Sequence, residues 1–430
     1  MATRRWEATV ADAGAVPPGV PAGESREGVA RETGGAEALR PRGAGSARVA
    51  DPSLAAERLQ IAVRAADLEG AIDDISSVQR RCAAFRDIFK ALRAEIGAVV
   101  VGQEQVVEET LLALFADGHV LLEGVPGLGK TLLVRTLGEA LALSFGRIQF
   151  TPDLMPADIT GTTVVVDDPA TGRRGFDFRP GPIFHQLLLA DEVNRATPKS
   201  QAALLEAMQE RSVTVSGRTR RLEQPFLVLA TQNPIEQEGT FTLPEAQLDR
   251  FLLKIVVPYS SRQDLHEILR RTTARAESHA RPVLDGSRII AAQRLARRLI
   301  VAPHVQDYLI RLVLATHPGS EAMPKGVRGW IAVGVSPRGA QAMVSAAKVK
   351  ALIDGRFAIS FDDVDAVALP ALRHRILRSF EAEADGVTTD DVVRRLLAEV
   401  PKSPVRSRSG LGAGARAASS TAAAGVATSP

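Results

Sequence analysis

The sequence predicts a doubly wound α/β core, with a parallel sheet between helical layers, followed by an all-helical domain. Three observations support this fold class. Short apolar runs alternate with helical patterns between residues 93 and 259, and parallel strands need helical crossovers between them. A glycine-rich loop joins one of these apolar runs to one of the helical patterns. After residue 260 the helical patterns continue, but comparable apolar runs stop.

Five apolar runs are expected to form the strands, because each is short, aliphatic and bounded by turn or helical signals. These runs are His119–Glu123, Arg147–Phe150, Leu187–Ala190, Phe226–Ala230 and Lys254–Val257. Later in the chain, apolar residues recur at helical spacing. The expected helices are Leu265–Arg275, Ser287–Leu299, His304–Thr316, Arg338–Leu352 and, as one or two helices, Phe361–Leu377.

The two ends of the chain differ in composition from its centre. Residues 1–52 are rich in Gly, Ala, Pro, Arg and Glu without periodicity, so we expect disorder there. Apolar residues at helical spacing in 53–92 predict one or two amphipathic helices that are only marginally attached to the core. We assign 93–259 to the core and 260–400 to the helical domain. The basic tail 401–430 is expected to be disordered.

Composition narrows the class of protein. Apolar residues make up 45% of the chain, which allows a large core. The net charge is only +3, and basic stretches interleaved with aromatic residues are missing, which disfavours a nucleic-acid partner. The single Cys82 excludes an internal disulfide and a cysteine metal site, and suits the cytoplasm. Neither a signal peptide nor a membrane span is expected.

The strongest motif is a glycine-rich loop between an expected strand and an expected helix. It has the P-loop (Walker A) spacing, in which backbone N–H groups surround a phosphate at the helix N-terminus. The nucleotide-binding residues would be Gly124, Val125, Pro126, Gly127, Leu128, Gly129, Lys130, Thr131 and Leu132. Lys130 would contact the β- and γ-phosphates of ATP, and Thr131 would hold Mg²⁺. The alternative, a chance glycine-rich turn, is disfavoured by the flanking strand and helix.

Two acidic residues follow the apolar run at Leu187. In an open α/β sheet, ligands bind outside the carboxyl ends of the strands. Asp191 would therefore lie near the phosphates and coordinate Mg²⁺, and Glu192 would polarise the attacking water. An apolar run that ends in two acids is common, so this assignment depends on the P-loop upstream.

A third strand end carries amides. The run from Phe226 ends in Asn233, which in the same sheet would lie near the γ-phosphate and help to position the water. The alternative is an ordinary turn, because Asn233 precedes Pro234 and this dipeptide favours turns. We favour the functional interpretation, because three strand ends then converge on one phosphate site.

Two arginines are weaker candidates. Arg250 suits a finger supplied to the γ-phosphate of a neighbouring subunit, although a surface ion pair with Asp249 fits the spacing as well. Arg338 follows Pro337 at the start of an expected helix, so its side chain could face the nucleotide from the helix N-terminus.

Taken together, these residues resemble the MoxR group of AAA+ ATPases over residues 93–377. The resemblance is carried by Gly102-Gln103, Gly124–Thr131, Phe150–Gly161, Phe178–Phe184, Ala190–Ala196, Thr231–Glu238 and Leu243–Phe251. It implies that Gly102 and Gln103 bind nucleotide, that Asn233 is the first sensor, Arg250 the arginine finger and Arg338 the lid sensor. It also implies an αβα core, an all-helical lid, an insertion at Phe178–Phe184 facing the substrate side, and a homo-oligomeric ring, usually of six subunits.

The expected function is that of an ATP-driven chaperone that remodels or matures protein complexes, and the resemblance implies a von Willebrand factor A domain partner. One alternative is the ATPase subunit of a metal chelatase, and another is a nucleic-acid motor. A nucleotide-locked scaffold is disfavoured, because such a scaffold needs no water activator, and Lys130, Asp191 and Glu192 are all present.

Overall fold

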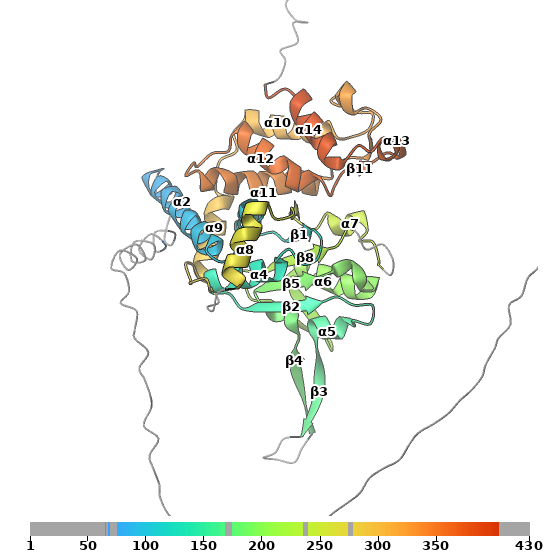
Figure 1. The fold of residues 1–430 in the computed structure, drawn as a ribbon. Helices are drawn as coiled ribbons and strands as arrows, with labels where there is room; N and C mark the ends of the chain where they lie inside the picture. The colour runs from blue at the N-terminus through green and yellow to red at the C-terminus, as the bar shows by residue number, and fades with distance from the viewer. Residues whose placement is uncertain are drawn as a thin grey trace, which may run out of the picture. The chain divides into compact units, whose positions relative to one another are not determined.

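The fold is taken from a computed structural model, which describes Ala65, Leu68 and residues 75–167, 174–234, 240–273 and 278–403. A parallel sheet of five strands lies at its centre, in the order β2-β5-β8-β1-β9 (Figure 1). The strands are β1 (Val120–Glu123), β2 (Phe145–Gln149), β5 (Leu187–Asp191), β8 (Leu227–Gln232) and β9 (Leu253–Val256). All five predicted strands are therefore confirmed, with ends that agree within two residues.

Apolar side chains leave both faces of this sheet, as expected for a sheet with helices on each side. Val120 and Leu122 of β1 join one buried cluster, while Leu121 between them joins a second. The first cluster includes residues of α3 (Glu104–Phe115) and α4 (Lys130–Ala140). The second includes residues of α5 (Pro156–Thr160) and α6 (Pro198–Glu210). The core is thus an αβα sandwich.

The amphipathic segment before the core is more firmly attached than the sequence indicates. Its described part contains α2 (Ile75–Gly97), and the expected boundary between residues 92 and 93 falls inside this helix. Phe85, Ile88 and Leu92 are fully buried and form one stripe at helical spacing. The ring of Phe85 lies edge-on against Phe115 of α3, with 4.8 Å between centroids. This stripe packs against the core, so the expected marginal attachment is wrong for α2.

Two antiparallel hairpins were not predicted. One pairs β3 (Gly161–Asp167) with β4 (Arg174–Pro180) and projects away from the sheet in Figure 1. The other pairs β6 (Ser212–Val215) with β7 (Arg218–Arg221). Their strands are mostly exposed or half-buried, with only Gly161 and Val213 buried, so neither hairpin carries the buried apolar run that identified the strands of the central sheet. The predicted insertion at Phe178–Phe184 spans the end of β4 and a short 3-10 helix.

The region after β9 is helical apart from a small sheet. Its helices are α8 (Arg262–Thr272), α9 (Gly286–Arg297), α10 (Pro303–Leu314), α11 (Pro337–Ile353), α12 (Phe361–Leu372), α13 (Phe380–Ala384) and α14 (Thr389–Glu399), and a further short helix, α7 (Glu245–Leu248), precedes β9. Each of the five helical segments predicted after residue 260 contains a helix, but the one expected to reach Leu377 ends at Leu372. Leu377 instead belongs to β11 (Leu377–Arg378), which pairs with β10 (Ile331–Val333).

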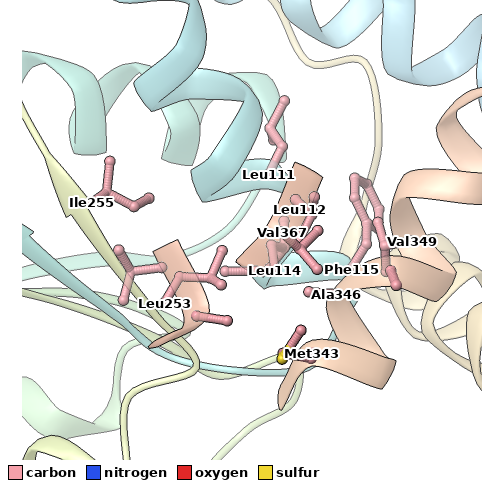
Figure 2. Close-up of a cluster of buried hydrophobic side chains, with 14 of the residues drawn as sticks. Leu111, Leu112, Leu114, Phe115, Leu253, Ile255, Met343, Ala346, Val349 and Val367 are labelled. Carbon is pink, nitrogen blue, oxygen red and sulfur yellow. The ribbon is translucent and has the colours of Figure 1, made fainter. Parts of the chain in front are cut away.

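The helical region shares one apolar cluster with the core. Figure 2 shows Leu111 and Phe115 of α3 and Leu253 of β9 close to Met343 and Val349 of α11. These side chains are buried, so α11 packs directly on the core through the face that carries Met343 and Val349.

The expectations of disorder for residues 1–52 and 401–430 lie outside the described residues, apart from Pro401–Ser403. Among the helices that the structure describes, none is long and apolar enough to cross a membrane.

Candidate functional site

The glycine-rich loop connects β1 to α4 and has an open inner face. Gly127 and Gly129 have φ angles of 84° and 75°, a left-handed conformation that favours glycine. No heavy atom lies within 4 Å of a Cβ placed on either residue. The concave side of the loop therefore has room for a phosphate at the N-terminus of α4.

Lys130 crosses the mouth of the loop. Its Nζ donates to the carbonyl oxygen of Gly124 at 2.6 Å and to that of Val125 at 3.3 Å. Burial lowers the pKa of Lys130, and the negative charges of Asp191 and Glu192 oppose this shift. The ammonium group thus lies between the loop and the two acids that the sequence analysis placed at this edge.

Gly102 and Gln103 support the loop from outside. The Gln103 amide donates to the carbonyl oxygen of Leu128 at 2.6 Å, and the other side-chain atom, Oε1, is buried without a partner. Gly102 has a φ of 70°, and a Cβ there would lie 2.2 Å from the carboxyl carbon of Asp264 in α8. A side chain at position 102 would therefore displace the Asp264 carboxylate, which caps the start of α8.

Asp191 ends β5 on the same edge of the sheet. One carboxylate oxygen accepts from Thr231 Oγ1 at 2.7 Å, and the other lies 2.6 Å from Nη2 of Arg147. Thr131, the other residue predicted to hold Mg²⁺, has an exposed side chain. The carboxylate and the hydroxyl are the hard oxygen donors that Mg²⁺ requires, so this donor set fits the ion.

Glu192 has an unusual backbone conformation, with a φ of 56° and a ψ of 51°. Such a left-handed conformation in a residue other than glycine is strained and often marks a functional site. Its N–H donates to Thr231 Oγ1 at 2.8 Å. Its carboxylate accepts from Gln149 at 2.8 Å and lies 3.2 Å from Nη1 of Arg195.

Asn233 directly follows β8, the strand between β5 and β1, and its side chain is buried. The residue before it, Gln232, accepts through its carbonyl from the N–H of Gly124 at 3.3 Å. The three predicted strand ends are therefore neighbours at one edge, and a phosphate in the loop would lie beside all three.

Arg250 and Arg338 lie elsewhere, where both line a cavity of about 350 Å³. Arg250 donates through Nη1 to the carbonyl oxygen of Leu205 at 2.9 Å, and its Nε is buried without a partner. Arg338 is exposed and has no side-chain partner among the described residues. Among the residues that the structure describes, no carboxylate pairs with either guanidinium group of this cavity.

This cavity lies at the amino edge of the sheet, by which we mean the end where the parallel strands begin; the carboxyl edge is the end where they finish. The cavity is also lined by Gly118 and His119, which precede β1, whereas the P-loop follows β1. At about 3.3 Å per residue, about 20 Å separate Gly118 from Gly124. The expectation that Arg338 faces the nucleotide is therefore not met within one chain, because α11 packs on α3 at the opposite edge.

Four polar residues around the acids were missed from the sequence: Arg147, Gln149, Arg195 and Thr231. Arg147 and Gln149 are two apart on β2, next to β5, so their side chains leave the same face of the sheet. Polar residues at that spacing, at the end of a predicted strand, were an available signal.

The fold and the loop define a P-loop ATPase of the AAA type. Residues 119–253 match the model of the ATPase family associated with various cellular activities (AAA), and residues 327–396 match the AAA lid domain. The sequence is 44% identical to the chaperone MoxR1 of Mycobacterium tuberculosis over 71% of this chain and 80% of that protein. The chain belongs to the MoxR family of AAA+ ATPases and hydrolyses ATP.

Other relatives agree. The YeaC protein of Bacillus subtilis is 41% identical over 72% of this chain and 93% of its own length. The MoxR protein of Methylorubrum extorquens is 33% identical over 74% of this chain and 96% of its own. A crystal structure of a candidate ATPase from Cytophaga hutchinsonii has a TM-score of 0.71 and 38% identity, and covers 76% of this chain and 98% of that one.

Proposed function

We propose that this protein is a MoxR-type chaperone whose ATP sites are completed between copies in a ring, usually of six subunits. The observation that carries the proposal is the separation of the two halves of the site. The P-loop and its acids lie at one edge of the sheet, and Arg250 and Arg338 lie at the other. A neighbouring copy can bring the two edges together.

Within one chain, the carboxyl edge holds what binding and water activation require. The loop N–H groups and Lys130 would contact the phosphates, and Glu192 would accept the proton of the attacking water. Asn233 would orient that water. Mg²⁺, held by Thr131 and Asp191, would neutralise charge on the β- and γ-phosphates when bound.

The amino edge supplies the missing positive charge. Negative charge on the γ-phosphate oxygens in the transition state is stabilised by a guanidinium group, and this edge presents two of them in a cavity. Arg250 binds a backbone carbonyl and forms no ion pair with a described carboxylate, so its charge would be matched by an incoming anion. We infer that both arginines act in trans, Arg250 as the finger and Arg338 as the lid sensor.

The client is proposed to be a protein complex under maturation, with a von Willebrand factor A domain protein as partner. The name of the Mycobacterium relative supports a chaperone role. The β3–β4 hairpin offers a surface away from the sheet, on which Phe176 is 83% exposed. A von Willebrand factor A protein encoded beside this chain and co-purifying with it would support the assignment, whereas chelatase subunits there would support the alternative.

The shared site is tested by mixing variants. Arg250→Ala should bind ATP about as tightly as wild type but hydrolyse it slower by about a thousandfold or more. Glu192→Gln should bind ATP but hydrolyse it slower by about a hundredfold to ten-thousandfold. Excess Glu192→Gln subunits would give Arg250→Ala subunits an intact arginine at their border, so phosphate release should rise above that of either variant alone.

Arg218→Ala is the matched control, because Arg218 is an exposed arginine on β7, outside both edges. Its activity should stay near wild type. Wild-type specific activity should also fall on dilution as copies separate. Absence of rescue at every mixing ratio, together with concentration-independent activity, would overturn the shared site.

A further inference from the structure

Arg375, just after α12, reaches from the helical region into the segment that carries Arg250. Its side chain is only 3% exposed, and its Nε donates to Oδ1 of Asp249 at 2.7 Å. The other guanidinium nitrogens donate to the carbonyl oxygens of Asp249 at 3.1 Å, Phe251 at 2.5 Å and Leu252 at 3.1 Å. One side chain therefore holds the backbone on both sides of Arg250.

The carboxylate of Asp249 also binds the start of α11. Its Oδ2 accepts from Ser336 Oγ at 2.9 Å, and the same hydroxyl accepts from the N–H of Arg338 at 3.2 Å. Asp249 thus connects the segment of Arg250 to the helix turn of Arg338. His374 adds a further link, because its Nε2 lies 3.1 Å from the carbonyl oxygen of Phe251.

The contacts that join Arg375, Asp249 and Ser336, here called the Arg375 joint, require an arginine. Burial lowers the pKa of Arg375 and the pair with Asp249 opposes the shift, while the charge of nearby Arg338 adds to it. A buried cation is costly unless its donors are satisfied, and the planar fork of arginine can serve a carboxylate and several carbonyls at once. Lysine has three donors on one atom and cannot span these acceptors.

We propose that Arg375 is a positioning residue for ATP hydrolysis, which acts through Asp249 to hold Arg250 and Arg338 in one fixed arrangement toward the neighbour's γ-phosphate. The inference rests on the proposed shared site. It adds that the two arginines are presented as one unit, set by the packing of the helical region on the core. Arg375 does not touch the nucleotide.

Arg375→Lys tests this role by keeping a cation and losing the fork. We expect kcat for ATP hydrolysis to fall by about tenfold to a hundredfold, because a misplacement of about 1 Å can have that effect. The affinity for ATP should stay near wild type, since the variant's own P-loop is untouched. Asp249→Asn, which keeps the shape of the carboxylate, should show the same pattern more weakly.

Subunit mixing separates positioning from a loss of folding. Glu192→Gln subunits keep the Arg375 joint intact. In excess, they should therefore restore activity to Arg375→Lys subunits, as they should to Arg250→Ala subunits. Arg356→Lys is the matched control, because Arg356 binds Asp363 through two nitrogens without contacting this segment. It should show near wild-type kcat.

The outcomes separate the two claims. If Arg250→Ala is rescued but neither Arg375→Lys nor Asp249→Asn is, the positioning role is overturned and the shared site stands. If Arg250→Ala is not rescued, the shared site fails and the inference fails with it. A fall in kcat for Arg356→Lys equal to that for Arg375→Lys would also overturn the inference, because any loss of an arginine pair would then suffice.

Discussion

The two edges of the sheet differ in how their charged side chains are paired. At the carboxyl edge each charged group already has a partner: Lys130 binds loop carbonyls, Asp191 binds Arg147, and Glu192 binds Gln149 and Arg195. At the amino edge Arg250 keeps a buried Nε without a partner, and Arg338 has no described side-chain partner. One edge holds the acids and the phosphate loop, and the other holds two guanidinium groups that pair with no described carboxylate.

The difference shows which charged groups find their partners within one chain and which do not. At the carboxyl edge the charges are matched within the chain, and a nucleotide would compete with these internal contacts. At the amino edge the carboxylates are used elsewhere: Asp249 binds Arg375 and Ser336, and Asp117 binds Arg211 and Arg297. The pairs with Arg375 and Arg297 tie the helical region to the core, and no described carboxylate pairs with Arg250 or Arg338.

The largest effect on ATP hydrolysis is expected from substitutions at the carboxyl edge. Glu192→Gln should lower kcat by about a hundredfold to ten-thousandfold, because an amide of nearly the same shape is a poor base, while ATP binding is kept. Lys130→Ala should instead weaken binding by about tenfold to a hundredfold, through loss of a charged contact. Nucleotide titration and phosphate release on both variants separate these effects. Near-normal turnover by Glu192→Gln would remove Glu192 from its role.

A smaller effect on ATP hydrolysis is expected at the amino edge, where it tests the role assigned to Arg338. Arg338→Ala should lower kcat by about tenfold to a hundredfold, in keeping with the loss of one charged contact to the transition state. Because Arg338 lies away from its own P-loop, excess Glu192→Gln subunits should restore activity. Gln341→Ala is the control, since Gln341 is an uncharged residue of the same helix and cavity. If Arg250→Ala is rescued and Arg338→Ala is not, Arg338 acts within its own chain.

The same comparison shows how much the sequence could predict. The P-loop, Asp191, Glu192 and Asn233 are specified locally, each by a strand that ends in the functional residue, and strand order then makes them neighbours. Helix α14 has a local signal too, because Thr388 and Asp391 form a capping box.

The amino edge could not be predicted, because its geometry depends on contacts far apart in the chain. Arg375 and Asp249 are separated by 126 positions, and neither position carries a periodic or motif signal for the pair. The position of Arg338 depends on how α11 packs over α3, which follows from the apolar cluster in Figure 2 rather than from the start of the helix. The hairpins were missed because their strands are largely exposed, with only Gly161 and Val213 buried, and so lack a buried apolar run.

The smallest expected effect concerns the stability of the amino edge. His119 is buried there, with Nδ1 accepting from the N–H of Val228 at 3.0 Å and Nε2 3.1 Å from the carbonyl oxygen of Met208. The bond from Val228 requires an unprotonated Nδ1 and therefore the neutral ring, in which Nε2 donates to Met208. Burial lowers the pKa of His119 from 6.5 to about 4, and the charge of Arg211 also lowers it, while the bond to Met208 and the charge of Asp117 oppose the shift.

The unfolded chain therefore takes up a proton on His119 below about pH 6.5, and the folded chain only near pH 4. The stability due to the neutral ring is fully present above pH 6.5 and is lost as the pH falls toward 4. A loss on the order of 3 kcal/mol in the free energy of unfolding is expected. His119→Gln removes the titrating group, so urea unfolding from pH 7.5 to 4 should show a shallower decline. His266→Gln, at an exposed histidine, should decline like wild type. Parallel curves for wild type and His119→Gln would show that His119 is not the group whose protonation weakens this edge.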